Sequence, residues 1–348
     1  MANETDNGKA TTTILRIISS TLTINPTLPR PICCLPKATH ARLNTLMHPR
    51  NSFLHAFCLC LIATFPVFAA PQSPIPLWPA TPPGEKEPAG EEKDTTKPTD
   101  NLVSGKPVIR LGNVSKPTLT FYPAPLEKNT GATVLVFPGG GYNILAMDLE
   151  GTEICEWFNS IGANAVLVKY RVPARKDQDK WLSPLQDGQR AISYVRERAA
   201  DWKIDPNRIG TLGFSAGGHL SALTSTRSEQ RAYQPMDDTD KLSCRPDFTI
   251  LIYPAYLVAK GTLNVSPELT ISKSTPPTFI AQTQDDPVGV EGSLGYYAAL
   301  TKAKIPSSIH LYPKGGHGYG LRPSTNNVSH WPRELEEWMR EAKLLQKK

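Results

Sequence analysis

The chain has 348 residues, a length that fits one large α/β domain or two smaller ones. Its hydrophobic fraction of 39% is ordinary for a globular protein and excludes disorder over most of its length. The net charge is +6, but residues 1–69 carry six Lys and Arg against two acidic residues, and no basic run follows them. This distribution excludes a nucleic-acid partner.

The segment 47–69 has the pattern of a signal peptide, with a basic start, an apolar stretch and small residues, Val67 and Ala69, at its end. Its apolar run is shorter than a membrane span and is interrupted by His55 and Pro66, so removal is favoured over anchoring. We expect translation from Met47, an untranslated or dispensable leader at 1–46, and a secreted or periplasmic protein without a stable membrane span.

A Pro-rich arm is expected at 70–106, followed by one catalytic domain at 107–348. Short apolar runs alternate there with helical patterns, which predicts a mostly parallel central sheet of about eight strands flanked by helices. The expected strands are 108–111, 119–122, 133–137, 165–170, 208–214, 248–253, 278–282 and 308–312. The expected helices are 151–161, 184–200, 217–226, 291–303 and 332–346.

A candidate nucleophile, Ser215, lies in a G-x-S-x-G motif at 213–217. The motif directly follows one expected strand and directly precedes an expected helix. Glycines at such a turn permit the strained backbone that lifts a serine hydroxyl clear of the sheet. The sequence therefore predicts Ser215 as the nucleophile of a hydrolase.

A nucleophilic serine needs a base, and four histidines follow residue 70. His219 and His330 fall in or at expected helices, and His310 falls inside a strand. His317 alone lies in a glycine-rich loop after the last strand, where open α/β sheets place their sites. We therefore predict His317 as the base.

The acid that orients the base is expected between Ser215 and His317 in the chain. Three aspartates, at 237, 238 and 240, fall in an expected polar surface loop, and Asp247 precedes a strand. Asp285 and Asp286 follow the strand 278–282 at the correct end of the sheet. These positions leave the pair as candidates.

Three glycines, 139–141, follow the strand 133–137 and precede Tyr142. In an α/β hydrolase this loop supplies backbone N–H groups to an oxyanion, together with the residue after the serine. We predict this role for Gly140, Gly141 and Ala216. A phosphate-binding loop is excluded because no Lys-Ser/Thr pair follows the glycines.

These segments together resemble the esterase/lipase branch of the α/β-hydrolase superfamily, especially secreted bacterial acetyl xylan esterases and bifunctional feruloyl/acetyl esterases. The resemblance rests on FPGGGY, DPNRIGTLGFSAGGHLSA, QTQDDPVGVEGS and YPKGGHGYG. It implies the α/β-hydrolase fold. In that family the acid lies three residues before a valine and ahead of a polar-x-Ser, a spacing that Asp285, Val288 and Ser293 meet. The resemblance thus favours Asp285 over Asp286.

The implied activity is that of a serine carboxylesterase acting on short acyl esters, with acetyl groups on a plant or algal polysaccharide as the expected substrate. Related lipases have His where this chain has Pro138, and the segment 255–277 is short for a lid, so a small or absent lid is expected. No metal or cofactor is expected. Cys155 and Cys244 lack metal-ligand spacing and are expected to be structural or unpaired.

Two alternatives remain from other classes. A xylan-degrading glycoside hydrolase would need two carboxylates flanking the glycosidic bond. A binding protein on the same fold would lack hydrolytic activity altogether.

Overall fold

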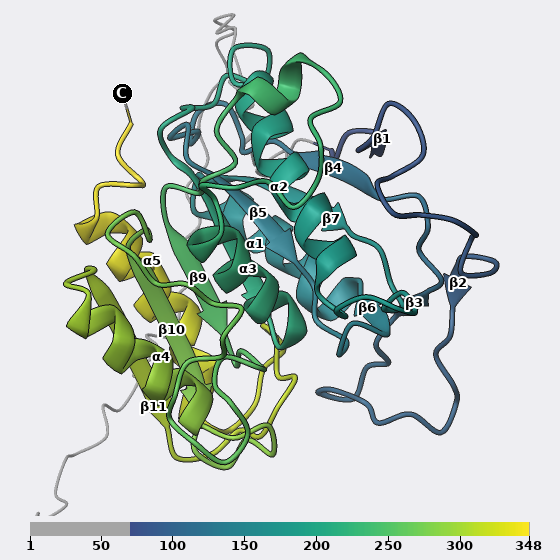
Figure 1. Cartoon of the computed structure of the whole chain (residues 1–348). Coiled ribbons are helices and arrows are strands. Elements are labelled where there is room, and N and C mark those ends of the chain that lie inside the picture. The colour runs from purple at the N-terminus through teal and green to yellow at the C-terminus, as the bar shows by residue number, and fades with distance from the viewer. Residues whose placement is uncertain (1–69, 348) are drawn as a thin grey trace, which may run out of the picture. The chain divides into compact units, whose positions relative to one another are not determined.

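The computed structural model describes residues 70–347 (Figure 1). The predicted leader at 1–46 and signal peptide at 47–69 lie outside the described residues. Within residues 70–347, no helix has the length and apolar character needed to cross a membrane.

Eight strands form the main sheet, in the order β1-β4-β7-β5-β8-β9-β10-β11 (Figure 1). Six of them, from β7 to β11 in that order, pair in parallel, whereas β4 pairs antiparallel with both β7 and β1. The bounds are β1 Ile75–Pro76, β4 Thr118–Tyr122, β5 Thr133–Phe137, β7 Asn164–Lys169, β8 Ile209–Phe214, β9 Thr249–Ile252, β10 Thr278–Thr283 and β11 Ser307–Tyr312. The predicted mostly parallel sheet is confirmed.

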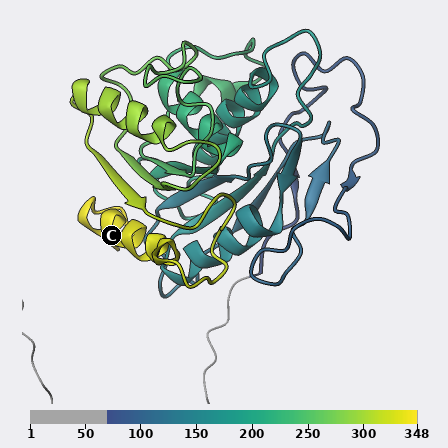
Figure 2. The same ribbon diagram turned by 90° about the horizontal axis from the view of Figure 1, so that it is seen from below.

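Helices cover both faces of this sheet (Figure 2). One face packs against α2 (Leu182–Glu197), α3 (Ala216–Thr226) and α4 (Glu291–Lys302). The opposite face packs against α1 (Glu153–Ser160) and α5 (Trp331–Glu341). Every residue of β5, β8, β9 and β10 is buried, which explains why these strands consist mainly of apolar and small residues.

A second sheet of three strands contains β2 (Lys93–Asp94), β3 (Arg110–Gly112) and β6 (Ile144–Ala146). The expected strand at 108–111 belongs to this small sheet, whereas β1 supplies the eighth strand of the main one. Sequence periodicity missed β1, β2 and β6 because each has only two or three residues.

The Pro-rich arm is anchored to the domain by its apolar segment. Trp78 is buried, and its indole Nε1 donates to the Asp187 carboxylate at 2.8 Å. Further along the arm, Glu85 pairs with Arg175 at 2.9 Å. These contacts make the arm an integral part of the fold.

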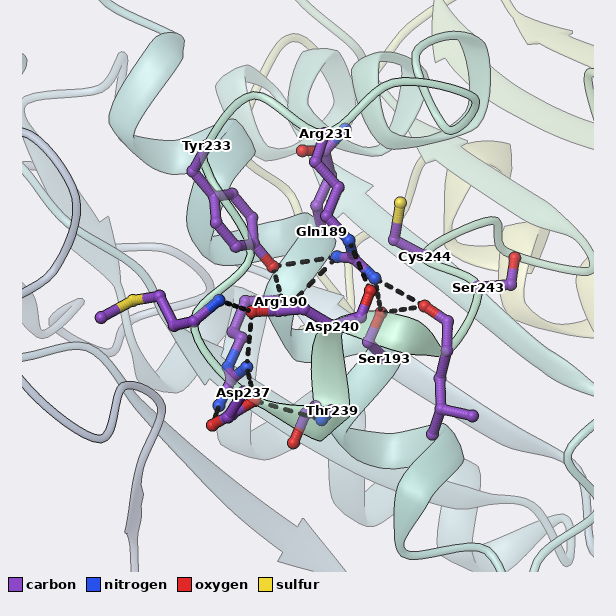
Figure 3. A network of polar contacts seen from close by, with 12 residues as sticks. Gln189, Arg190, Ser193, Arg231, Tyr233, Asp237, Thr239, Asp240, Ser243 and Cys244 are labelled. Carbon is purple, nitrogen blue, oxygen red and sulfur yellow. Dashed lines mark hydrogen bonds and ion pairs between the residues drawn. The ribbon is translucent and has the colours of Figure 1, made fainter.

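A buried polar network joins α2 to the loop 231–244 (Figure 3). Asp240 accepts from the Tyr233 hydroxyl at 2.6 Å and pairs with Arg190 at 2.9 Å. Asp237 also pairs with Arg190, at 2.5 Å. The interpretation of this loop as polar surface is therefore wrong for Asp240, whose side chain is 0% exposed, and holds for Asp238, at 86%. The buried arginine explains the difference, because it compensates a charge that the sequence pattern places in solvent.

Replacing Asp240 by Asn should lower the free energy of unfolding by about 3 kcal/mol, because Arg190 and Arg231 both lose a buried anionic partner and only Asp237 still pairs with Arg190. Urea denaturation measures this change. The matched control is Asp238→Asn, where the side chain is exposed, and the midpoint should not move. Equal effects of the two substitutions would contradict the assigned role of the network.

Candidate active site

Ser215 lies in a strained turn between β8 and α3. Its backbone has φ of 50° and ψ of −117°, an unusual combination for a residue with a side chain. Gly213 permits this turn, because a Cβ atom there would overlap the carbonyl of Gly217. The local sequence thus places the serine hydroxyl at the carboxyl end of the central strands.

His317 connects this serine to an aspartate. Its Nε2 lies 2.9 Å from Ser215 Oγ, and its Nδ1 lies 2.8 Å from Asp286 Oδ2. Because a carboxylate only accepts hydrogen bonds, Nδ1 carries the proton and Nε2 accepts from the serine hydroxyl. The His317 side chain is 24% exposed, whereas that of Asp286 is 0% exposed.

The structure corrects the prediction for the acid, because Asp286 contacts His317 and Asp285 does not take that position. Asp285 instead accepts from the backbone N–H groups of Gly315 and Gly316, at 3.2 and 2.8 Å. The hydrogen bond from Gly316 is the main reason that the pKa of Asp285 lies below its usual value. Asp285 therefore fixes the backbone of the loop that carries His317.

A tight turn explains why the second aspartate points inward. The N–H of Val288 donates to Asp286 Oδ1 at 2.8 Å, and Gln282 Nε2 donates to Oδ2 at 3.1 Å. Ser293 in turn donates to the Gln282 side chain at 2.5 Å. Val288 and Ser293, which spacing associated with Asp285, thus support Asp286.

The three glycines lie in a loop, residues 138–142, that we call the glycine loop. Two of them have positive φ, 131° at Gly140 and 65° at Gly141. Among the residues the structure describes, no protein group accepts from the N–H of Gly140, Gly141 or Ala216. These are the three donors that the sequence assigns to an oxyanion.

Two other histidines, His219 and His310, contact residues other than Ser215. His219 is buried, with Nδ1 3.0 Å from the Tyr142 hydroxyl and Nε2 3.3 Å from Glu268 Oε1. Burial is the main cause of its lowered pKa. His310 contacts Ser308 within β11. His317 is thus the histidine that the fold brings to Ser215.

Sequence reasoning missed two side chains beside this site, Glu150 and Tyr253. Glu150 is 4% exposed and accepts from the N–H of Gly139, the first residue of the three-glycine run, at 2.6 Å. The Tyr253 ring lies edge-on to the His317 ring, with centroids 4.8 Å apart. Neither residue lies in a motif, so the sequence carries no signal for them.

Comparison with known proteins assigns this chain to a family. The family described as BD-FAE matches residues 119–252. The structure of an acetyl ester-xyloside bifunctional hydrolase from Caldicellulosiruptor lactoaceticus is 34% identical with a TM-score of 0.63, over 78% of this chain and 97% of the other. The chain belongs to the esterases of the α/β-hydrolase superfamily.

Two curated relatives of this esterase extend the comparison. An acetylxylan esterase from Xylanibacter ruminicola is 30% identical over 239 residues, which are 62% of this chain and 46% of the relative. An endo-1,4-β-xylanase B from Butyrivibrio fibrisolvens is 32% identical over 204 residues, which are 53% of this chain and 32% of the relative. The chain thus spans less than half the length of either relative.

Replacing Asp286 by Asn should lower kcat for p-nitrophenyl acetate by about 10⁴-fold, because the imidazole then loses the partner that sets its tautomer. The matched control is Asp285→Asn, which keeps one acceptor for the Gly316 N–H and should retain most of the activity. Steady-state kinetics of the two variants decides between the aspartates. A larger loss in Asp285→Asn would contradict the assignment.

Proposed function

We propose that this protein is a serine carboxylesterase that hydrolyses short acyl esters, with acetyl groups on a plant or algal polysaccharide as its substrate. The observation that carries the proposal is the position of His317, within hydrogen-bond distance of both Ser215 and Asp286. This arrangement supports acyl transfer through a covalent acyl-enzyme.

In the first step, His317 Nε2 takes the hydroxyl proton while Ser215 Oγ attacks the ester carbonyl carbon. The carbonyl oxygen becomes an oxyanion, which the N–H groups of Gly140, Gly141 and Ala216 stabilise. His317 then gives its proton to the leaving alcohol, and the acyl group remains on Ser215. Asp286 stabilises the imidazolium that forms between the two transfers.

In the second step, water takes the place of the alcohol. His317 removes a proton from water as its oxygen attacks the acyl-enzyme carbonyl, and the same donors hold the second oxyanion. Collapse of this intermediate returns the proton to Ser215 Oγ and releases the carboxylic acid. Every proton and acyl transfer in the two steps thus runs between Ser215, His317, the ester and water.

The polysaccharide substrate is supported by what the relatives are called, an acetylxylan esterase and an acetyl ester-xyloside hydrolase. Pro138 stands where related lipases have histidine, which favours carbohydrate esters over lipids. Secretion or export to the periplasm would give access to such a polymer, and it rests on the signal-peptide pattern at 47–69.

A xylan-degrading glycoside hydrolase is the second candidate, because the names of two relatives include xylanase and xyloside. Glycoside hydrolysis needs two carboxylates facing the glycosidic bond. The two acids beside Ser215, Glu150 and Asp286, are both buried, and their oxygens accept hydrogen bonds from protein groups. This environment favours the esterase.

Ser215→Ala should lower acetate release from acetylated xylan and hydrolysis of p-nitrophenyl acetate by at least about 10⁴-fold, because no nucleophile remains. In the wild-type enzyme, acetate should be cleaved faster than octanoate in a p-nitrophenyl ester series. Strong preference for octanoate would contradict the carbohydrate-ester substrate. Release of reducing sugar by Ser215→Ala would favour the glycoside hydrolase, and a wild-type protein inactive on every ester would favour a binding protein.

A further inference from the structure

A buried carboxylate lies directly behind the glycine loop. Glu150 belongs to a short π-helical turn, Asp148–Thr152, which precedes α1. Glu150 is 4% exposed, and the described partners of its oxygens are Gly139 and Tyr253 rather than a Lys or Arg. π-Helical turns occur frequently at functional sites. A buried acid at this position, without a Lys or Arg partner among the described residues, indicates a role beyond packing.

Both oxygens of Glu150 accept hydrogen bonds from the active-site region. Oε2 accepts from the Gly139 N–H at 2.6 Å, and Oε1 accepts from the Tyr253 hydroxyl at 2.8 Å. Burial raises the pKa of Glu150, and these two hydrogen bonds act in the opposite direction. A carboxylate satisfies both donors, with one oxygen for each.

The first contact ties Glu150 to the glycine loop next to the nucleophile. A Cβ atom at Gly139 would lie 2.7 Å from Glu150 Oε2 and 2.9 Å from Ser215 Cβ. The Gly139 backbone is thus enclosed between the carboxylate and the serine. Gly139 directly precedes the two glycines whose N–H groups are assigned to the oxyanion.

The second contact ties Glu150 to the base. Tyr253 has a positive φ of 38°, and its N–H donates to Ala281 at 2.7 Å. Its ring lies edge-on against His317, and its hydroxyl is fixed by Glu150. A non-glycine residue with positive φ persists only where its surroundings enforce that conformation. The hydrogen bond to Glu150 is one such constraint.

We propose that Glu150 is a positioning residue that connects the glycine loop to the tyrosine ring supporting His317. The inference rests on the proposed esterase function. One oxygen of this carboxylate accepts from Gly139, which directly precedes the proposed oxyanion donors, and the other accepts from Tyr253, whose ring contacts the base. The separation between these donors and the base is therefore set before substrate binds, which is the arrangement that electrostatic stabilisation of a transition state requires.

The test compares Glu150→Met, Glu150→Gln and Tyr253→Phe. Methionine keeps the length of the side chain but accepts neither bond, so kcat for p-nitrophenyl acetate should fall about 10²-fold, as for the loss of an oxyanion donor. Glutamine should restore most of the activity, because its oxygen accepts from Gly139 and its amide donates to the Tyr253 hydroxyl. Tyr253→Phe keeps the ring and removes one bond, so its kcat should lie between those of Glu150→Met and wild type.

The KM for p-nitrophenyl acetate should change little in all three variants, because the hydrogen bonds of Glu150 act on the transition state rather than on substrate binding. Circular dichroism and thermal unfolding give the folded fraction by which each kcat is corrected. Wild-type kcat in folded Glu150→Met would overturn the inference. If Glu150→Met does not fold, wild-type kcat in Tyr253→Phe would overturn it instead. An inactive wild-type enzyme would overturn the proposed function and this inference with it.

Discussion

The His317 imidazole connects the two other side chains of the candidate active site. Its two nitrogens lie 2.9 Å from Ser215 and 2.8 Å from Asp286, residues 102 and 31 positions away in the chain. His317 follows β11, Ser215 follows β8 and Asp286 follows β10. The parallel strands of this sheet have their carboxyl ends at one edge, which brings the three residues together.

The glycine loop is held by short segments that the sequence pattern does not single out. The glycine loop is followed at once by β6, which pairs with β3, and β3 pairs with β2 of the Pro-rich arm. The Tyr170 hydroxyl also donates to the Pro138 carbonyl at 2.5 Å. The arm therefore contributes a strand to the sheet that follows the glycine loop, and it packs as part of the described fold.

The sequence predicts the main sheet, Ser215 and His317 because each depends on local patterns, such as continuous apolar strands and glycine-rich turns. The choice between Asp285 and Asp286 depends instead on which side chain a turn directs inward, and residue spacing does not encode that direction. The sequence does not predict the role of Glu150 for a related reason. Its partners, Gly139 and Tyr253, are 11 and 103 residues away, and only the folded chain brings the three together.

The most direct test of the account is covalent labelling with diethyl p-nitrophenyl phosphate, followed by peptide mass spectrometry. An activated serine should displace p-nitrophenol and acquire one diethylphosphoryl group. We expect one equivalent of label on the peptide that contains Ser215, and almost none in His317→Ala under the same conditions. Label on another residue, or equal labelling of Ser215 in both proteins, would contradict the proposed role of His317.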